Sequence, residues 1–288
     1  MSEEEKLKEA RERINRMMQM RERLNRIKEK MNKIKYKIGV ISGKGGVGKS
    51  TVTALLALAF ASKGYKVAVF DSDFHGPSIP KMLGVEGGIV KVTKDKRIIP
   101  VEGPLGIKVI SIYYFLPDPT TAVIWRGPLK RSFFEELLDL TEFGDLDILL
   151  FDLPPGTGDE ALNLAQVVPG LTGVIAVTQP TDVSAVAVAK AIDFANKVGI
   201  RVLGIIENMS GFLCPGEGKI YKIFHGEGGK MLSVKYGVPL LGQVPIDPRI
   251  SEYGDKGLEN LIKNSETEIA KEFIKIAKKL IEIITKLS

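Results

Sequence analysis

From Tyr36 onward, short apolar runs alternate along the chain with longer segments in which apolar residues recur every three or four positions. The short runs predict strands at 37–42, 66–70, 106–111, 146–151, 173–179, 201–206 and 239–244. The periodic segments predict helices at 50–61, 129–140, 182–198 and 227–236. Runs that are apolar at every position are typical of strands buried on both faces. The pattern therefore predicts an α/β fold with a doubly wound, mostly parallel sheet, whose ligands gather at the carboxyl ends of the strands.

Residues 1–35 have a different pattern, which predicts one long, basic, amphipathic helix without Gly or Pro. Its apolar positions are Ala10, Ile14, Met17, Leu24, Ile27, Met31 and Ile34. A stripe of this length needs a partner, so we expect the helix to pack on the predicted second domain, residues 36–288, or to pair with another helix in a dimer. Its arginines offer the alternative of a membrane surface or RNA, although no aromatic residue precedes Tyr36 for base stacking.

Residues 265–287 predict a second amphipathic helix, with Ser265 and Glu268 as a capping box. Its broad apolar face consists of Ile269, Phe273, Ile276, Ala277, Leu280, Ile283, Ile284 and Leu287. Such a helix can bind a membrane or cover a sheet, and the width of this face favours a position on the sheet.

The net charge of +6 belongs entirely to the N-terminal arm. Residues 1–37 hold 13 Lys and Arg against 7 Asp and Glu, and the rest of the chain holds 28 of each sign. With 288 residues, 44% of them hydrophobic, the chain can bury a large core. Its single cysteine, Cys214, excludes an intramolecular disulfide. With no cleavable signal peptide and no apolar run of about 18 residues, we expect a soluble, cytoplasmic protein.

A phosphate-binding loop of the form G-x-x-x-x-G-K-[ST] stands between a predicted strand and a predicted helix. It consists of Gly43, Lys44, Gly45, Gly46, Val47, Gly48, Lys49, Ser50 and Thr51. Glycines let backbone N–H groups turn toward phosphate oxygens, and the following helix directs its positive end at the same anion. Lys49 is expected to reach the β- and γ-phosphates and Ser50 to bind Mg²⁺. A plain Gly-rich turn is the alternative, and the flanking elements favour the phosphate loop.

Lys44 distinguishes this loop from the ordinary form. The pattern resembles the deviant Walker A signature K-G-G-x-G-K-[ST] of the MinD, ParA, nitrogenase iron protein and Mrp group of ATPases. In that group the corresponding lysine reaches the phosphates of the partner subunit and neutralises developing charge, as an arginine finger does. The resemblance therefore implies a slow, dimer-dependent ATPase in which Lys44 is catalytic.

An acidic segment, Asp71-Ser72-Asp73-Phe74-His75-Gly76-Pro77-Ser78, begins where an apolar strand is predicted to end. It resembles the first switch of the Mrp subgroup. The resemblance implies that Asp73 orients or activates the attacking water and that Asp71 supports the magnesium shell. An ordinary turn or helix cap is the alternative. His75 has no metal-ligand spacing with His225, so we interpret it as a loop residue.

The apolar run 148–151 ends in Asp152, which is the Walker B form that holds Mg²⁺ directly or through water. The following segment, Leu153-Pro154-Pro155-Gly156-Thr157-Gly158-Asp159, resembles the second switch of the Mrp type. Gly156 lies where its backbone N–H can sense the γ-phosphate. An ordinary strand-end turn explains the Gly and Pro but not the whole agreement.

Two further segments resemble the base-binding parts of the same group. Glu207-Asn208-Met209-Ser210 is similar to a segment whose asparagine hydrogen-bonds adenine. The segment 242–247, which contains Pro245, is similar to the loop that closes over the base. These matches, together with the absence of an N-K-x-D pattern, favour ATP over GTP. Trp125-Arg126-Gly127-Pro128 also matches the Mrp subgroup.

The resemblance fails at one site. Mrp-type proteins usually carry C-P-x-C after the asparagine segment, and thiolates of two subunits hold a [4Fe-4S] cluster. Here the sequence is Cys214-Pro215-Gly216-Glu217, so a symmetric dimer supplies two thiolates instead of four. The remaining ligands would be Glu217, His225 or a small external thiol, and the alternatives are a labile cluster, another metal or no ligand.

Together, these features predict an ATP- and Mg²⁺-dependent homodimer that carries iron-sulfur clusters to apoproteins, with Cys214 as cluster ligand. No stable membrane or nucleic-acid partner is expected. The alternatives are a MinD- or ParA-like positioning ATPase, which uses its amphipathic ends to bind membrane or nucleic acid, and a nucleotide-switched scaffold without a cluster.

Overall fold

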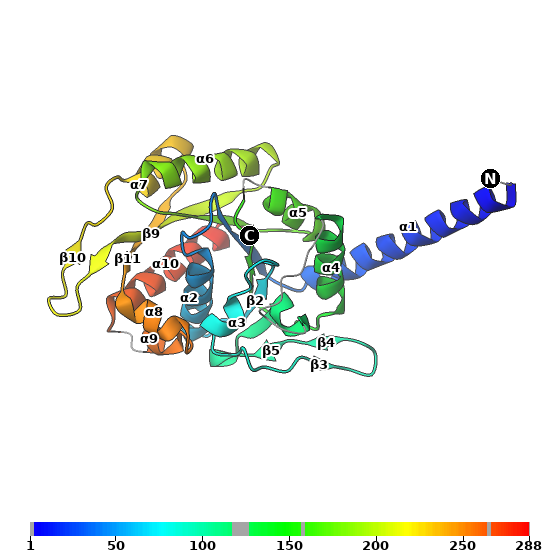
Figure 1. The fold of residues 1–288 in the computed structure, drawn as a ribbon, viewed down its shortest axis with the longest axis horizontal. Coiled ribbons are helices and arrows are strands. Elements are labelled where there is room, and N and C mark those ends of the chain that lie inside the picture. Colours follow the sequence, from blue (N-terminus) through cyan, green and yellow to red (C-terminus); the bar gives the residue numbers. More distant parts are fainter. Residues whose placement is uncertain (1–2, 117–126, 157–158, 264–265, 288) are drawn as a thin grey trace.

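The computed structural model describes residues 3–116, 127–156, 159–263 and 266–287 (Figure 1). The main sheet of this described part has the order β10, β9, β8, β1, β7, β2, β6, β5, and β11 pairs with β9. Its strands are β1 (Tyr36–Ser42), β2 (Val67–Asp71), β5 (Val101–Glu102), β6 (Lys108–Ser111), β7 (Ile148–Asp152), β8 (Gly173–Thr178), β9 (Val202–Leu213), β10 (Ile220–Tyr221) and β11 (Leu240–Ile246). Only β5 and β10 pair antiparallel, with β6 and β9 respectively, which confirms the mostly parallel sheet. A separate hairpin joins β3 (Lys91–Val92) and β4 (Ile98–Ile99).

Helices cover both faces of the sheet (Figure 1). They are α1 (Glu3–Met31), α2 (Lys49–Ser62), α3 (Ile79–Met82), α4 (Gly127–Leu140), α5 (Asp159–Val167), α6 (Asp182–Lys197), α7 (Gly228–Tyr236), α8 (Pro248–Gly254), α9 (Glu259–Lys263) and α10 (Glu268–Thr285), with 3₁₀ turns at η1 (Pro104–Gly106) and η2 (Ile112–Phe115). Of the Trp125-Arg126-Gly127-Pro128 match, Trp125 and Arg126 lie outside the described residues, and Gly127 begins α4.

The strand side chains alternate between two separate cores. Ile38 and Val40 of β1 belong to the core beneath α2, α9 and α10, whereas Ile41 belongs to the core beneath α4 to α7. Strands β1, β2, β7 and β8 are buried at every position, as their unbroken apolar runs predict. The sheet is therefore a rigid platform, and the loops after its parallel strands are fixed at one edge.

The C-terminal helix α10 covers the sheet. Most of its apolar face, including Phe273 and Leu280, is buried, and the helix packs against α2 and β11; Ile283 is half-buried, and Leu287, beyond the end of the helix, is exposed. This confirms the expected covering role. The predicted capping box is wrong: α10 begins at Glu268, and Thr267 is the N-cap, accepting a hydrogen bond from the Ala270 N–H at 3.1 Å. Ser265 lies outside the described residues.

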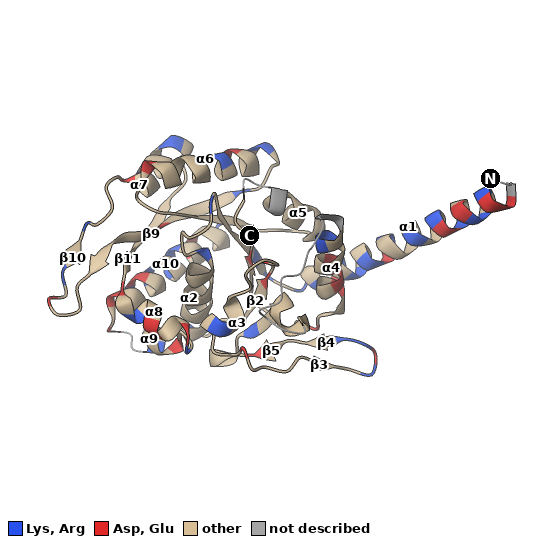
Figure 2. Cartoon of the chain, viewed as in Figure 1, with Lys and Arg blue, Asp and Glu red and all other residues tan. Residues whose placement is uncertain are grey.

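The N-terminal helix is only partly attached to the rest of the protein. Its last turns pack on α4, where Ile27 and Met31 are fully buried, so the expected packing holds for this end. The remaining helix, residues 4–22, is exposed and extends away from the sheet (Figure 1). Figure 2 shows acidic and basic residues mixed along this exposed part. The predicted helix to residue 35 ends at Met31, because Lys37 Nζ binds the carbonyl oxygens of Met31 and Ile34 and so caps the chain reversal.

Candidate nucleotide and magnesium site

The phosphate loop occupies the predicted position between β1 and α2. Gly46 and Gly48 have φ values of 77° and 81°, a left-handed conformation that favours glycine. At Gly43 a Cβ atom would lie 2.1 Å from the backbone of Ala187 in α6, and at Gly48 it would lie 2.2 Å from Asn208 Nδ2. Glycine at both positions is therefore required by the packing of α6 and β9 against the loop.

Asp152 at the end of β7 is the centre of a buried polar network. Its side chain is fully buried, and Lys49 Nζ lies 2.8 Å from its Oδ1. Ser50 Oγ donates to Oδ2 at 2.6 Å, and Thr53 Oγ1 donates to Oδ1 at 2.8 Å. Ser50 and Asp152 thus place two oxygen donors side by side, the ligand type that Mg²⁺ prefers. Mg²⁺ commonly takes few protein ligands and completes its shell with water and phosphate oxygens, so this pair fits the ion.

Sequence reasoning did not identify Thr53. It lies four residues after Lys49 in α2, so both side chains lie on the same face of the helix and meet Asp152. The four-residue spacing from the loop lysine was the available signal.

Asp71 lies beside Asp152, because β2 and β7 pair in register at these residues. Its carboxyl group is buried and accepts hydrogen bonds from Ser111 Oγ at 3.0 Å, the Asp73 N–H at 3.2 Å and the Ile79 N–H at 3.4 Å. Burial, together with the charge of Asp152, raises the pKa of Asp71 to about 8. Asp71 therefore holds both ends of the segment 73–79; its predicted place in the magnesium shell stays a prediction.

Lys44 and Asp73 line one pocket of about 210 Å³ together with the phosphate loop and Pro155. Asp73 Oδ1 accepts from the N–H groups of His75 and Gly76, so a local turn fixes its carboxylate. The Gly156 N–H donates to the Ser42 carbonyl at 3.2 Å, which joins the second switch segment to the end of β1. The structure thus brings the predicted phosphate, water and sensor residues to one side of the loop.

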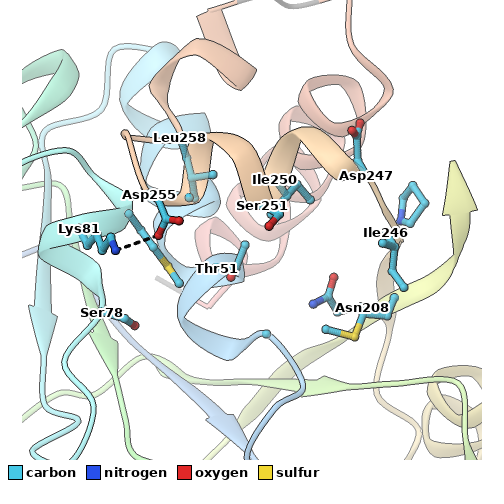
Figure 3. Close-up of a pocket in the computed structure, with 15 residues that line it drawn as sticks. Thr51, Ser78, Lys81, Asn208, Ile246, Asp247, Ile250, Ser251, Asp255 and Leu258 are labelled. Carbon is cyan, nitrogen blue, oxygen red and sulfur yellow. Dashed lines mark ion pairs between the residues drawn. The ribbon is translucent and has the colours of Figure 1, made fainter. Parts of the chain in front are cut away.

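A second pocket, of about 450 Å³, adjoins the first and shares Gly48 and Thr51 with it (Figure 3). Asn208 and Pro245 line it as predicted, and Asn208 Nδ2 donates to the Val47 carbonyl at 2.8 Å. Most of the other lining side chains come from 78–82 and 246–258. The two pockets form a continuous site with a phosphate end and a largely apolar end suited to a flat base.

Three acidic residues have roles here that were not predicted: Asp247 and Asp255 line this second pocket, and Glu207 precedes its lining residue Asn208. Glu207 accepts from the Gly229 N–H at 2.7 Å and from Gln243 Nε2 at 2.6 Å, so it fixes β9 against α7 and β11. Asp247 caps α8 by accepting from the Arg249 N–H. Asp255 pairs with Lys81 at 2.9 Å on one side of the pocket (Figure 3). The sequence Asp247-Pro248 is a common helix start and was the available signal for the cap.

Cys214 lies apart from this site, in the hairpin between β9 and β10 (Figure 1). Its thiol is half-exposed, and its carbonyl accepts from the N–H groups of Glu217 and Gly218. The Glu217 carboxylate accepts from Tyr221 Oη at 2.6 Å, and His225 is exposed. Within the described part of the chain, no three His, Cys, Asp or Glu side chains are grouped so that they could hold a metal ion. One chain therefore supplies an incomplete ligand set at Cys214.

The parallel sheet, the phosphate loop and the Lys49–Asp152 pair define a P-loop NTPase. The family described as "ParA: NUBPL iron-transfer P-loop NTPase" matches residues 33–281, and the chain belongs to it.

Two curated relatives are named iron-sulfur cluster carrier protein. One, from Saccharolobus solfataricus, is 53% identical over 84% of this chain and 82% of its own length. The other, from Methanocaldococcus jannaschii, is 46% identical over the same two shares.

Solved structures agree with the fold. A nucleotide-binding protein of Archaeoglobus fulgidus in complex with ADP has a TM-score of 0.73 and 39% identity, over 87% of this chain and 96% of its own. The cell division protein MinD of Aquifex aeolicus, 21% identical, has a TM-score of 0.62 over 86% of this chain and 97% of its own, which shows the shared fold. Each helix that the structure describes is too short or too polar to cross a membrane.

The raised pKa of Asp71 makes a testable contribution to stability. Between pH 4 and pH 8, the folded protein keeps a proton on Asp71 that the unfolded chain releases. The stabilisation is therefore complete at low pH and is lost as the pH rises to about 8. The quantity to compare is the unfolding free energy of the wild type minus that of Asp71→Asn. We expect this difference to fall by at most about 1.4 kcal/mol per pH unit between pH 4 and pH 8 and to be constant above pH 8.

Urea unfolding of both proteins from pH 5 to pH 9 measures this difference. Asp145→Asn is the matched control, because the Asp145 side chain is 95% exposed. A wild-type minus Asp71→Asn difference that does not change with pH would contradict the assignment.

Proposed function

We propose that the chain is a slow ATPase that acts as a homodimer and carries iron-sulfur clusters to apoproteins. The convergence of Lys49 and Ser50 on Asp152, within a complete phosphate loop, supports ATP and Mg²⁺. Membership of the iron-transfer family and the names of the relatives support a cluster as the cargo.

The buried network gives each residue a role in hydrolysis. When ATP binds, the Lys49 ammonium group leaves Asp152 and contacts the β- and γ-phosphates. The Asp152 carboxylate is then free to hold Mg²⁺ together with Ser50. The ion neutralises charge on the phosphate oxygens. Asp73, fixed by its turn, orients the water whose oxygen attacks the γ-phosphorus. Lys44, at the rim of the same pocket, acts on the phosphates of the second subunit, which makes hydrolysis dependent on the dimer.

The second pocket is assigned to adenine. Asn208 Oδ1 and Nδ2 can hydrogen-bond a base edge, and Pro245 offers an apolar surface to its ring. The Gly156 N–H, now bonded to the Ser42 carbonyl, is the sensor of the γ-phosphate in the second switch.

The cargo site requires two copies of the chain. Each copy contributes one Cys214 thiolate from the β9–β10 hairpin. The remaining cluster ligands must be other groups than these two cysteines. The Glu217 carboxylate already accepts a hydrogen bond from Tyr221 and lies 3.7 Å from Lys219 Nζ, so it is poorly available as a cluster ligand. We therefore expect a labile [4Fe-4S] cluster, which suits a carrier that must release it.

The alternatives are less well supported. A MinD-like membrane tail needs a free C-terminal helix, whereas the apolar face of α10 is buried against α2 and β11. A nucleotide-switched scaffold without a cluster would share the ATP site but would not need Cys214. The proposal includes no stable membrane or nucleic-acid partner, and a cytoplasmic location stays a prediction.

Lys44→Ala tests whether hydrolysis depends on a second subunit. We expect ATP binding to be retained and kcat to fall by about 10²- to 10³-fold, because one charge that stabilises the transition state is lost. Steady-state hydrolysis, measured against protein concentration, should show specific activity rising with concentration in the wild type and not in the variant. Lys63→Ala, at an exposed lysine beyond α2, is the control. Equal activity in wild type and Lys44→Ala would refute the role in trans.

The cargo is tested by anaerobic reconstitution with iron and sulfide. Wild type should gain visible charge-transfer absorption and bound iron, whereas Cys214→Ala should gain neither. Glu217→Cys, which creates a C-P-G-C sequence, should bind a cluster that resists a chelator for longer, since thiolate replaces weaker ligands. The absence of bound iron in all three proteins would reject the carrier function and leave an ATPase of another purpose.

A further inference from the structure

The exposed part of α1, residues 4–22, has an apolar stripe that the folded chain does not cover. Leu7, Ile14 and Met17 recur at seven- and three-residue steps, with 55%, 56% and 64% of their surfaces exposed. Isolated helices of about this length are marginal in water, because their stability comes mostly from packing of an apolar face. The exposed arm therefore needs a partner surface.

The arm cannot easily fold back onto its own domain. At its base, Arg26 makes two hydrogen bonds to the buried Asp139 of α4, at 2.8 and 2.6 Å. Lys30 adds a bond to the Thr141 carbonyl at 2.8 Å. Because α1 is one continuous helix to Met31, these contacts fix the direction of the whole arm away from the sheet (Figure 1).

Charge is distributed unevenly along α1. Residues 3–12 hold five Glu against three Lys and Arg, whereas residues 13–30 hold seven Lys and Arg against two Glu. Two copies aligned antiparallel would place the acidic half of each opposite the basic half of the other, and parallel copies would oppose like charges. Each domain lies at the C-terminal end of its arm, so antiparallel arms keep the two domains apart (Figure 1).

We propose that the arms of two copies of this chain pair as an antiparallel two-helix coiled coil centred near Ile14 and Met17. This contact is separate from the nucleotide site and forms without ATP. A uniformly basic arm would favour a nucleic acid or an anionic membrane, but the five glutamates at its end oppose such a surface.

Sedimentation velocity of the full chain, with EDTA and without nucleotide, tests the pairing. Wild type should form dimers, and the double variant Ile14→Glu/Met17→Glu should raise the dimer dissociation constant at least tenfold, an estimate that corresponds to about 1.4 kcal/mol. The control is Asn15→Glu/Gln19→Glu, which adds the same charges beside the stripe and should dimerise as wild type does. Lys44→Ala should also dimerise normally, so this result is independent of the ATPase proposal.

Spin labels at residue 5, introduced as Glu5→Cys in a Cys214→Ser background, report the orientation. An antiparallel pair places the two labels about 30 Å apart, as follows from 1.5 Å per residue and a centre between Ile14 and Met17. A monomeric wild type, or a control variant as weak as the stripe variant, would overturn the proposal. A label separation of about 10 Å, the distance between adjacent helix axes, would indicate parallel arms and would also overturn it. Binding of the arm to RNA or anionic vesicles without self-association would overturn it as well.

Discussion

The buried ion pair between Lys49 and Asp152 is the interaction on which the rest of the site depends. Removing two charges from water is costly unless further hydrogen bonds satisfy them, and Ser50 and Thr53 supply these bonds to Asp152. Burial of the neighbouring Asp71, together with the negative charge of Asp152, raises the pKa of Asp71 to about 8. The pair therefore keeps a lysine and a carboxylate in contact until better partners bind. For Lys49 the better partner is a nucleotide phosphate, and for Asp152 it is a divalent cation.

The same aspartate joins the catalytic centre to the segments that must respond to it. The backbone carbonyl of Asp152 accepts from both the N–H and the Oγ of Ser72, so the first switch begins on the residue that would hold the metal. From this switch, His75 Nε2 lies 2.6 Å from Lys130 Nζ of α4. The other end of α4 holds α1 through Asp139. A series of contacts therefore leads from Asp152 through the first switch and α4 to the base of the exposed arm.

The fold and the phosphate loop could be predicted from the sequence because patterns of adjacent residues encode them. Unbroken apolar runs identified the buried strands, and consecutive glycines with Lys49 identified the anion site, because both are encoded by adjacent residues. Contacts between distant segments were not predictable in this way. Thr53 joins the site only through the packing of α2 against β7, and the strand expected at 201–206 continues to Leu213 because β11 and β10 pair with its extension. The stripe of α1 could be recognised, but which part of it is buried depends on α4.

The exchange of partners by Lys49 and Asp152 is the central claim, and a crystal structure with Mg²⁺ and a non-hydrolysable ATP analogue tests it most directly. The account predicts that Lys49 Nζ moves from Asp152 to the β- and γ-phosphates, that Ser50 and Asp152 face the metal, and that the base lies against Asn208. A nucleotide bound elsewhere, or bound here with Lys49 still paired to Asp152 and no metal at Ser50, would contradict the account.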